Sequence, residues 1–348
     1  MAAQVGVDVG SSAIKVVQLG GSGGKRTVEA MGLGINPVGG WGETEAQSLQ
    51  LAEAIRKTIG DAGVKLKRVR VALHEALVYT RVIDMPPLSE AELASALSWE
   101  AEQYVPVPLS EVNLDWQILG SREMADSDSK VLKRRKMAVL LVAAPKVLID
   151  KVVAVAQLAG LEPVGLETDI LALTRAVVPP AIPGPMLVCH LGAAGTEIGV
   201  MEAGQPVFIF AAATGGVALT RAIATGLKLE FAQAEQYKRT YGLLDDQLEG
   251  KIKQALVEPM TVIVNELKRA MSFYVAHAEG VVPVKQLVLS GGGAQLPGLG
   301  GYLAGQLNLE TVVANPVAGM NWGSQVRNRW VGIESVFSVA VGLALGGE

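Results

Sequence analysis

The chain has 348 residues, of which 50% are apolar and only 5% aromatic, and its formal net charge is −4. This length suits two lobes, each able to bury an interior built mainly from aliphatic side chains. The mild acidity excludes a nucleic-acid binder, which would need a basic face. The single cysteine excludes an internal disulfide framework.

Membrane and export signals are missing from the sequence pattern. The apolar stretch 137–145 falls well short of the ~20 residues that span a bilayer. The N-terminus lacks a basic region followed by a hydrophobic run, which a signal peptide would show. We therefore expect a cytoplasmic protein.

The first half of the chain opens with a predicted hairpin. Residues 5–9 form a β-branched run that ends at Gly10-Ser11-Ser12, and a second β-rich run follows at 13–19. Ser89 and Glu92 have the form of a capping box, which predicts that a helix begins there. The other elements expected in this half are helices at 46–60 and 146–159, strands at 69–73, 77–83, 111–119, 137–144 and 164–166, and a long exposed loop at 121–136.

The second half restarts after a string of four prolines between Val177 and Pro185, which marks the expected lobe boundary. The predicted lobes are therefore 1–180 and 181–348. The strands expected after the boundary lie at 186–191 and 286–290, with further strand-like runs that continue up to 211. The helices expected there lie at 216–225, 230–240, 246–278, 298–306 and 334–345. Mixed sheets with covering helices indicate an α/β protein.

Two segments look like copies of each other. Residues 7–13 and 189–195 both join strand to strand through a turn of small residues. Asp8 aligns with His190 and Gly10 with Gly192, which suggests an internal duplication and two related lobes that face a cleft.

The turns have the chemistry of phosphate binding. Small side chains let the backbone approach an anion, and successive N–H groups in a turn form an anion-binding concavity. Lys15 would add a positive charge, and Asp8 would hold a hydrated Mg²⁺. The alternative is that each segment is a hairpin with an ordinary Gly/Ser turn.

Two further glycine segments extend this pattern. A predicted buried strand runs into Gly291-Gly292-Gly293, where bare backbone would let a purine ring or ribose lie flat; the alternative is a flexible strand-to-helix turn. Gly215-Gly216 opens a predicted helix, whose free N–H groups favour phosphate.

The order of these glycine-bearing segments along the chain resembles that of the actin-like ATPase superfamily. Its phosphate-1, phosphate-2 and adenosine motifs match Asp8–Lys15, His190–Glu197 and Ser290–Gly298. Segments 81–86, 100–106 and 111–115 are similar to the inserted subdomain of the type IV pilus assembly PilM family, which is related to the division protein FtsA. Segments 234–238, 266–269 and 339–345 also fit that family.

The resemblance implies an α/β protein with the actin-like ATPase fold, two duplicated lobes around a nucleotide cleft. It implies a small inserted α+β subdomain at about 68–145 in the first lobe, and a terminal helix that returns to that lobe. ATP and Mg²⁺ would bind in the cleft, with Asp8 at the metal. The residues expected to bind the nucleotide are Asp8, Gly10, Ser11, Ser12, Ala13, Lys15, Gly192, Ala193, Ala194, Gly195, Thr196, Gly215, Gly216, Glu266, Arg269, Gly291, Gly292 and Gly293. For Glu266 and Arg269 the alternative is a solvated ion pair.

The resemblance also implies a partner, the N-terminal cytoplasmic peptide of the inner-membrane protein PilN. The expected groove borders the inserted subdomain, where Trp99, Tyr104 and 105–108 offer apolar surface; a core or turn role is the alternative. Other pilus assembly proteins and self-association are further expected contacts. The chain would sit at the inner face of the inner membrane only through its partner.

One position departs from the superfamily. His190 fills the place of the usual aspartate, and a neutral imidazole brings no negative charge to Mg²⁺. We therefore expect little or no ATP hydrolysis and no catalytic residue. Cys189 is not expected to act with His190, because neighbours on a strand point to opposite faces.

Two other functions remain open at this point. A small-molecule kinase of the same superfamily would need a carboxylate base beside the substrate hydroxyl. A filament-forming protein of the FtsA type usually carries a linker and an amphipathic tail, which this chain does not show.

Overall fold

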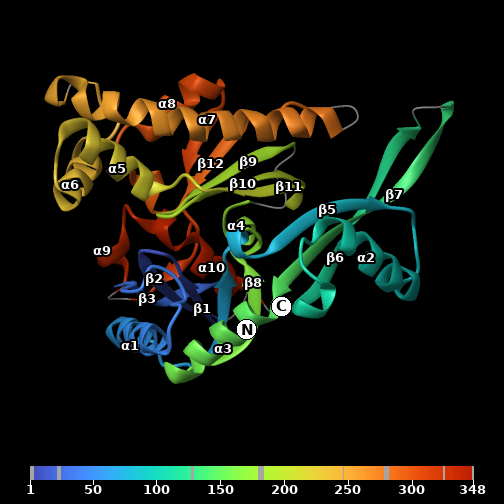
Figure 1. The fold of residues 1–348 in the computed structure, drawn as a ribbon, viewed down its shortest axis with the longest axis horizontal. Helices are drawn as coiled ribbons and strands as arrows, with labels where there is room; N and C mark the ends of the chain where they lie inside the picture. Colours follow the sequence, from blue (N-terminus) through green and yellow to red (C-terminus); the bar gives the residue numbers. More distant parts are fainter. Residues whose placement is uncertain are drawn as a thin grey trace.

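The fold consists of two similar lobes and a small third unit beside them (Figure 1). The structure, a computed structural model, describes residues 4–21, 25–126, 129–178, 184–245, 247–277, 282–323 and 326–346. The lobe boundary expected at 180/181 falls within 179–183, outside the described residues. No helix in the described part of the chain is long and apolar enough to cross a membrane.

The first lobe is built on a six-stranded sheet. In spatial order its strands are β14 (Asn321–Trp322), β3 (Thr27–Ile35), β2 (Ala13–Gly20), β1 (Gln4–Val9), β4 (Arg68–Leu73) and β8 (Glu162–Thr168). β1 is antiparallel to β2 and parallel to β4. Helices α1 (Glu45–Ala62) and α3 (Lys146–Leu158) cover the face on which Val5, Val7 and Val9 are buried. Asp8, which alternates with these valines, therefore lies on the other face near the end of β1.

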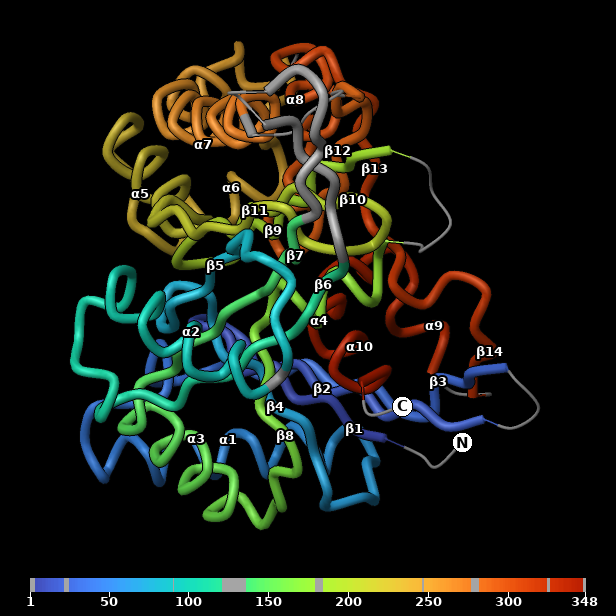
Figure 2. Tube along the Cα trace, turned by 90° about the vertical axis from the view of Figure 1, so that its right-hand side faces the viewer, coloured from blue at the N-terminus to red at the C-terminus, as the bar shows by residue number. Residues whose placement is uncertain are grey.

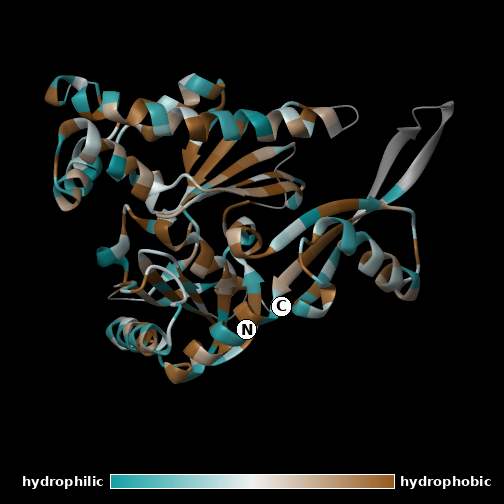
Figure 3. Ribbon diagram, viewed as in Figure 1, coloured by the Kyte–Doolittle hydropathy of each residue, from teal (hydrophilic) through white to brown (hydrophobic). Residues whose placement is uncertain are grey.

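The second lobe repeats this plan. Its sheet runs β11 (Gln205–Ala212), β10 (Thr196–Glu202), β9 (Met186–Leu191), β12 (Gln286–Ser290) and β13 (Glu310–Val313). β9 is antiparallel to β10 and parallel to β12, as β1 is to β2 and β4. Its helices are α5 (Gly216–Leu227), α6 (Phe231–Tyr241), α7 (Lys251–His277) and α8 (Leu299–Leu307). The matched order and directions confirm the duplication, and the strands of this lobe are mostly hydrophobic (Figure 3).

The third sheet belongs to the inserted subdomain. Its strands, in order, are β5 (Tyr79–Met85), β7 (Ser129–Pro145) and β6 (Val112–Asp126), and α2 (Glu90–Tyr104) packs against it. The backbone N–H of Ser89 donates to Glu92 Oε2 (2.9 Å), which is the reciprocal bond that the capping box predicts, and Ser89 Oγ donates to the same oxygen. The loop expected at 121–136 is wrong, because β6 and β7 pair along this stretch from Ser121–Met137 to Ala125–Lys133.

Two helices meet on the inner face of the first sheet. α10 (Ser338–Leu345) lies against β1, β2 and α4 (Asp169–Val177), opposite α1 and α3 (Figure 2). Residues 338–344 are all buried. A Cβ at Gly6 would fall on the carbonyl of Ala340, and one at Gly342 on the carbonyl of Ala172, so both glycines are needed for this close approach.

Short elements complete the chain. They are η1 (Glu75–Leu77), η2 (Leu109–Glu111), η3 (Leu248–Gly250), η4 (Gly292–Gln295), α9 (Arg327–Trp330) and η5 (Glu334–Phe337). The terminal helix predicted over 334–345 is thus η5 followed by α10.

Candidate functional site

A cavity of about 580 Å³ lies between the two lobes, and both lobes contribute to its wall. The first lobe contributes Gly10, Ser11, Ser12 and Lys15, and the second contributes 192–197. The two turns that the sequence pairs with each other therefore face one shared space.

The turn between β1 and β2 presents free backbone donors to this cavity. The N–H of Gly10 closes the turn on the carbonyl of Ala13 (2.9 Å). Asn36 Nδ2 donates to the carbonyl of Gly10 (2.8 Å) and fixes the turn from behind. Within the described residues the N–H groups of Ser11 and Ser12 donate to no acceptor. Two such amides side by side are suited to an anion.

Asp8 and Lys15 stand below this turn. Asp8 is 1% exposed, Lys15 Nζ lies 3.0 Å from Asp8 Oδ2, and Oδ1 accepts no hydrogen bond from any described group. A buried carboxylate oxygen without a donor requires an explanation, and the water shell of a Mg²⁺ ion supplies donors. The residues present therefore fit the predicted cation.

The turn between β9 and β10 has the same form. The N–H of Gly192 bonds the carbonyl of Gly195 (2.9 Å), as Gly10 does to Ala13 in the first turn. The N–H groups of Ala193 and Ala194 donate to no acceptor in the part of the chain that the structure describes. Four free amides, two from each lobe, thus belong to residues that line the same cavity.

Gly215 and Gly216 support the second turn from behind. The N–H of Gly216 donates to the carbonyl of Gly192 and that of Val217 to the carbonyl of Ala193, both at 2.9 Å. A Cβ at Gly215 would lie 2.5 Å from the nitrogen of Gly195. The expectation of free N–H groups at the start of α5 is corrected for Gly216 and Val217, because the turn itself uses their N–H groups.

A half-buried cation anchors α5 in this position. Lys238 Nζ donates to the carbonyl of Gly216 (2.9 Å) and to Thr220 Oγ1 (2.7 Å), and it pairs with Glu235 at 2.6 Å. Burial raises the pKa of Glu235, but hydrogen bonds from Lys238, Thr220 and Arg239 outweigh it and lower this pKa to about 2. The ion pair of Lys238 and Glu235 on α6 therefore holds the start of α5, which in turn supports the second turn.

His190 and Cys189 lie on opposite faces of β9. Cys189 is part of the second lobe's core, where burial raises the pKa of its thiol to about 12, so it is no nucleophile. His190 lines the cavity, and burial lowers its pKa to about 4, so the imidazole is neutral. Ser290 Oγ donates to the carbonyl of Ser335 (3.3 Å), so His190 Nδ1 donates to Ser290 Oγ (3.2 Å).

Three further polar side chains meet in the cavity region, and sequence reasoning did not identify them. His74 follows β4, Asp169 is the first residue of α4, and Glu197 is the second residue of β10. His74 Nδ1 lies 2.8 Å from Asp169 Oδ2 and 4.0 Å from Glu197 Oε1. The only sequence signal for this cluster was that Glu197 closes the segment matched to the phosphate-2 motif.

Burial and mutual charge set the protonation of this cluster. Burial alone would lower the pKa of His74. The hydrogen bond with Asp169 and the negative charge of Asp169 outweigh burial and raise the pKa of His74 to about 9. The pKa of Asp169 is lowered, because His74 outweighs the effect of burial. Burial and the charge of Asp169 raise the pKa of Glu197 well above its usual range and that of Glu75 to about 8.

The glycine triplet has two roles. Gly291 has φ +83°, and a Cβ there would lie 2.6 Å from the carbonyl oxygen of Leu191; a Cβ on Gly293 would strike the Leu191 side chain. Gly292 has open space where its Cβ would be. Gly291 and Gly293 therefore serve packing, and only Gly292 offers open backbone to a ligand.

Glu266 and Arg269 form the ion pair that their spacing allows, at 2.7 Å. Arg269 Cζ lies 4.9 Å from the ring centroid of Phe210 on β11, whereas the glycine triplet follows β12. β10 and β9 separate these two strands. The described structure does not place this pair in the cavity wall, and its contact with adenosine stays a prediction.

The cavity has an apolar arm where the inserted subdomain joins the first lobe. We define the apolar arm by Trp41, Leu77, Pro145, Val147 and Leu148. Val147 is 77% exposed and Leu77 45%, although both are large and apolar. Trp41 is buried, yet no described group accepts its Nε1–H. Leu77 and Val147 therefore leave apolar surface exposed beside the cavity.

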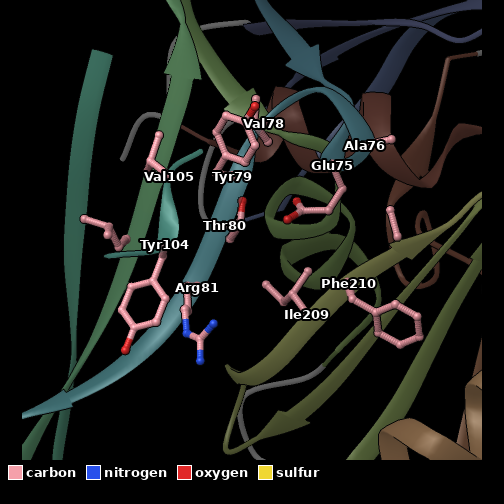
Figure 4. A pocket seen from close by; sticks show the side chains of 12 residues that line it. Glu75, Ala76, Val78, Tyr79, Thr80, Arg81, Tyr104, Val105, Ile209 and Phe210 are labelled. Atoms are coloured by element: carbon pink, nitrogen blue, oxygen red, sulfur yellow. The ribbon is translucent and has the colours of Figure 1, made fainter. Parts of the chain in front are cut away.

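A second hollow, of about 300 Å³, lies between the inserted subdomain and the second lobe. It is bordered by β5 on one side and β11 on the other, and we call it the β5–β11 groove (Figure 4). Arg81 lies 3.9 Å from the ring centroid of Tyr104, and Ile209 and Phe210 form the opposite wall. Trp99, on the same helix as Tyr104, is 64% exposed and does not line this groove.

Comparisons with known proteins agree with this architecture. A family model described as type IV pilus assembly protein PilM matches residues 6–348. A chain of the solved PilM–PilN type IV pilus biogenesis complex is 27% identical in sequence to this chain, with a TM-score of 0.82. The alignment covers 98% of this chain and 97% of that chain.

Two more distant structures share the fold. The ethanolamine utilization protein EutJ from Carboxydothermus hydrogenoformans gives a TM-score of 0.57 at 18% identity, covering 100% of this chain and 91% of its own. MreB5 of Spiroplasma citri bound to ADP gives 0.52 at 13% identity, covering 99% and 96%. At these identities the likeness shows the actin-like fold.

Proposed function

Because the chain belongs to the type IV pilus assembly protein PilM family, we propose that it is an ATP-binding scaffold of a type IV pilus or related secretion machine. The observation that carries this proposal is the pair of matched turns whose four free N–H groups belong to residues of one cavity wall. A polyphosphate between them would accept hydrogen bonds from both lobes and hold the cleft closed.

The residues around the turns have distinct roles in this proposal. Ser11, Ser12, Ala193 and Ala194 donate backbone N–H groups to the phosphates, and Lys15 adds a charge. Asp8 Oδ1 accepts from the water shell of Mg²⁺, which neutralises charge on the phosphate oxygens when bound. Gly292 supplies open backbone for the adenosine.

The same site supports weak hydrolysis at most. His190 is neutral and bonded to Ser290, so it adds no negative charge near the cation. Asp169 is held by His74 and by backbone N–H groups, and its lowered pKa makes it a poor general base. ATP would therefore act as a ligand that orders the cleft.

The partner proposed here is the N-terminal cytoplasmic peptide of a PilN-like inner-membrane protein. A protein of that name forms a complex with a chain 27% identical to this one. The apolar arm suits such a peptide, because Leu77 and Val147 are exposed beside the cavity. Binding there would place the chain at the inner face of the inner membrane through its partner.

Calorimetry with ATP and Mg²⁺ tests the nucleotide site. Lys15→Met removes the ammonium group at the cavity and keeps the length of the side chain. The loss of a charge-assisted hydrogen bond costs about 1.5–3 kcal/mol, which is roughly 10–100-fold in affinity. The matched control is Lys57→Met, at an exposed position on α1. Absence of any heat with folded parent protein would refute the nucleotide proposal.

Fluorescence anisotropy with a labelled PilN-like N-terminal peptide tests the partner site. We expect Val147→Glu to abolish binding and Tyr104→Ala, in the β5–β11 groove, to leave it unchanged. Trp99→Ala controls for loss of an exposed aromatic side chain. The reverse pattern would move the peptide to the β5–β11 groove, and no binding by the parent would refute the partner.

The comparisons do not favour the small-molecule kinase or the FtsA-type filament. The family match spans residues 6–348 and so covers both lobes and the inserted subdomain.

A further inference from the structure

Two sheet edges border the β5–β11 groove. β5 is the outer strand of the third sheet, and β11 is the outer strand of the second lobe's sheet. Within the described residues, no backbone hydrogen bond joins either strand to a neighbour on its outer side. An unpaired edge offers a row of N–H and C=O groups, on which an extended chain can add as a further strand.

The two faces of β5 have different surroundings at this edge. Arg81 shares its face with Ile83, which packs in the core beneath α2. Val82 lies on the opposite face and belongs to the same apolar cluster as Ile209 of β11. A chain added beside β5 would therefore point alternate side chains toward Arg81 and toward the wall formed by Ile209 and Phe210 (Figure 4).

Arg81 is a cation that is held in place without a carboxylate partner. Its Cζ lies 3.9 Å from the ring centroid of Tyr104, its side chain is exposed, and no described carboxylate pairs with it. Stacking on the ring leaves the N–H groups at the rim of the guanidinium free for bidentate bonds to a carboxylate.

The acid that lines the groove does not oppose this binding. Burial and the charge of Asp169 raise the pKa of Glu75 to about 8, so Glu75 is mostly protonated at neutral pH. The charge presented to a ligand in the groove is therefore that of Arg81.

We propose that the β5–β11 groove binds an extended segment of a partner protein in which acidic and apolar residues alternate. The segment would add to the edge of β5, with an acidic side chain on Arg81 and the flanking apolar side chains on Ile209 and Phe210. The hollow of about 300 Å³ is at the lower end of the range of ligand sites, so it suits a short stretch of chain.

This surface is distinct from the apolar arm. None of the five residues that define the apolar arm lines the β5–β11 groove. The inference therefore goes beyond the PilN-like partner, and it does not depend on nucleotide binding.

The test measures fluorescence anisotropy of labelled synthetic peptides with the full chain. One short peptide alternates Glu and Val, and its counterpart has Lys in place of every Glu; we expect only the Glu peptide to bind. Arg81→Gln should weaken that binding roughly 10-fold or more, because a hydrogen bond between charged groups is lost. Arg221→Gln, at an exposed position on α5, is the matched control and should leave the affinity unchanged.

Two further measurements separate recognition from folding. Arg81→Glu should bind the Lys peptide more tightly than the Glu peptide, a reversal that a damaged fold would not produce. N-methylation of alternate residues removes the N–H groups along one edge of the peptide, so at least one of the two complementary methylated peptides should not bind.

Four results would overturn the proposal. Folded parent protein that does not bind the Glu peptide would show that the groove is no docking site. If Arg81→Glu keeps the parent's preference, Arg81 does not read the acidic side chain. If both methylated peptides bind like the unmodified one, the segment is not added as a strand. If a PilN-like peptide displaces the Glu peptide, the two share one site.

Discussion

Gly342→Ala should destabilise the first lobe by about 3 kcal/mol. The new Cβ would lie 3.0 Å from Ala172 Cα and still nearer the carbonyl of that residue on α4. Both groups are backbone of buried helices, so the strain falls at the upper end of the 1–3 kcal/mol range for overpacking, about 3 kcal/mol. The hydrogen bond from Arg175 Nη1 to the carbonyl of Gly342 (2.9 Å) would be lost as well, at about 1 kcal/mol. Alanine returns about 1 kcal/mol of helix propensity.

The expected result is a lower melting temperature. An unfolding entropy of about 2.1 cal/mol/K per residue makes 3 kcal/mol equal to roughly 4 °C for a chain of this length. The matched control is Gly305→Ala on α8, where a Cβ meets nothing within 4 Å. That variant should melt at or slightly above the parent temperature. A Gly342→Ala protein that melts with the parent would show that α10 and α4 can separate without cost, and the packing argument would fail.

Three further predictions concern the cleft. His190→Asp restores a negative charge at the end of β9 and should raise Mg²⁺-dependent ATP hydrolysis at least ~10-fold in a phosphate-release assay; an unchanged rate would contradict the account of weak hydrolysis. Lys238→Met removes the ammonium that holds the start of α5 and should weaken ATP binding about 10-fold in calorimetry, although Lys238 does not line the cavity; unchanged affinity would show that the second turn needs no anchor. The folded-state pKa of Glu235, about 2, lies below its ordinary value, so its stabilisation is complete above pH 4.5 and is lost as the pH falls toward 2. Glu235→Gln should flatten this acid limb in thermal scans, and an unaltered acid limb would assign the loss to other groups.

The sequence predicts the two turns and their pairing well, because the strand-turn-strand pattern is local. It misses β3, since Gly32 and Gly34 weaken the β-strand pattern there. A Cβ at Gly32 would lie 2.7 Å from the side chain of Ala62 on α1, so packing of the helix requires that glycine. The inner parts of the third-sheet hairpin, at 111–119 and 137–144, are predicted, but its extension is missed for another reason: the two polar stretches within 121–136 have the pattern of a loop until they pair with each other.

The candidate site shows a similar limit. Asp8, Lys15 and the turn residues are found by motif, whereas His74 and Asp169 lie 95 positions apart and meet only through the parallel pairing of β4 with β8. No local pattern encodes that pairing. His190 is found as a departure from a motif, but its neutral state depends on burial, which the sequence does not give.

The position of α10 has a consequence for synthesis. The first lobe begins at β1, yet the helix that covers the inner face of that strand is encoded after the second lobe and leaves the ribosome after it. Until then one side of β1 and β2 lacks its apolar cover and is open to chaperones or to other chains. Completion of this lobe therefore waits for the whole second lobe to be translated. Truncation near residue 338 should accordingly destabilise the first lobe, although its strands are synthesised first.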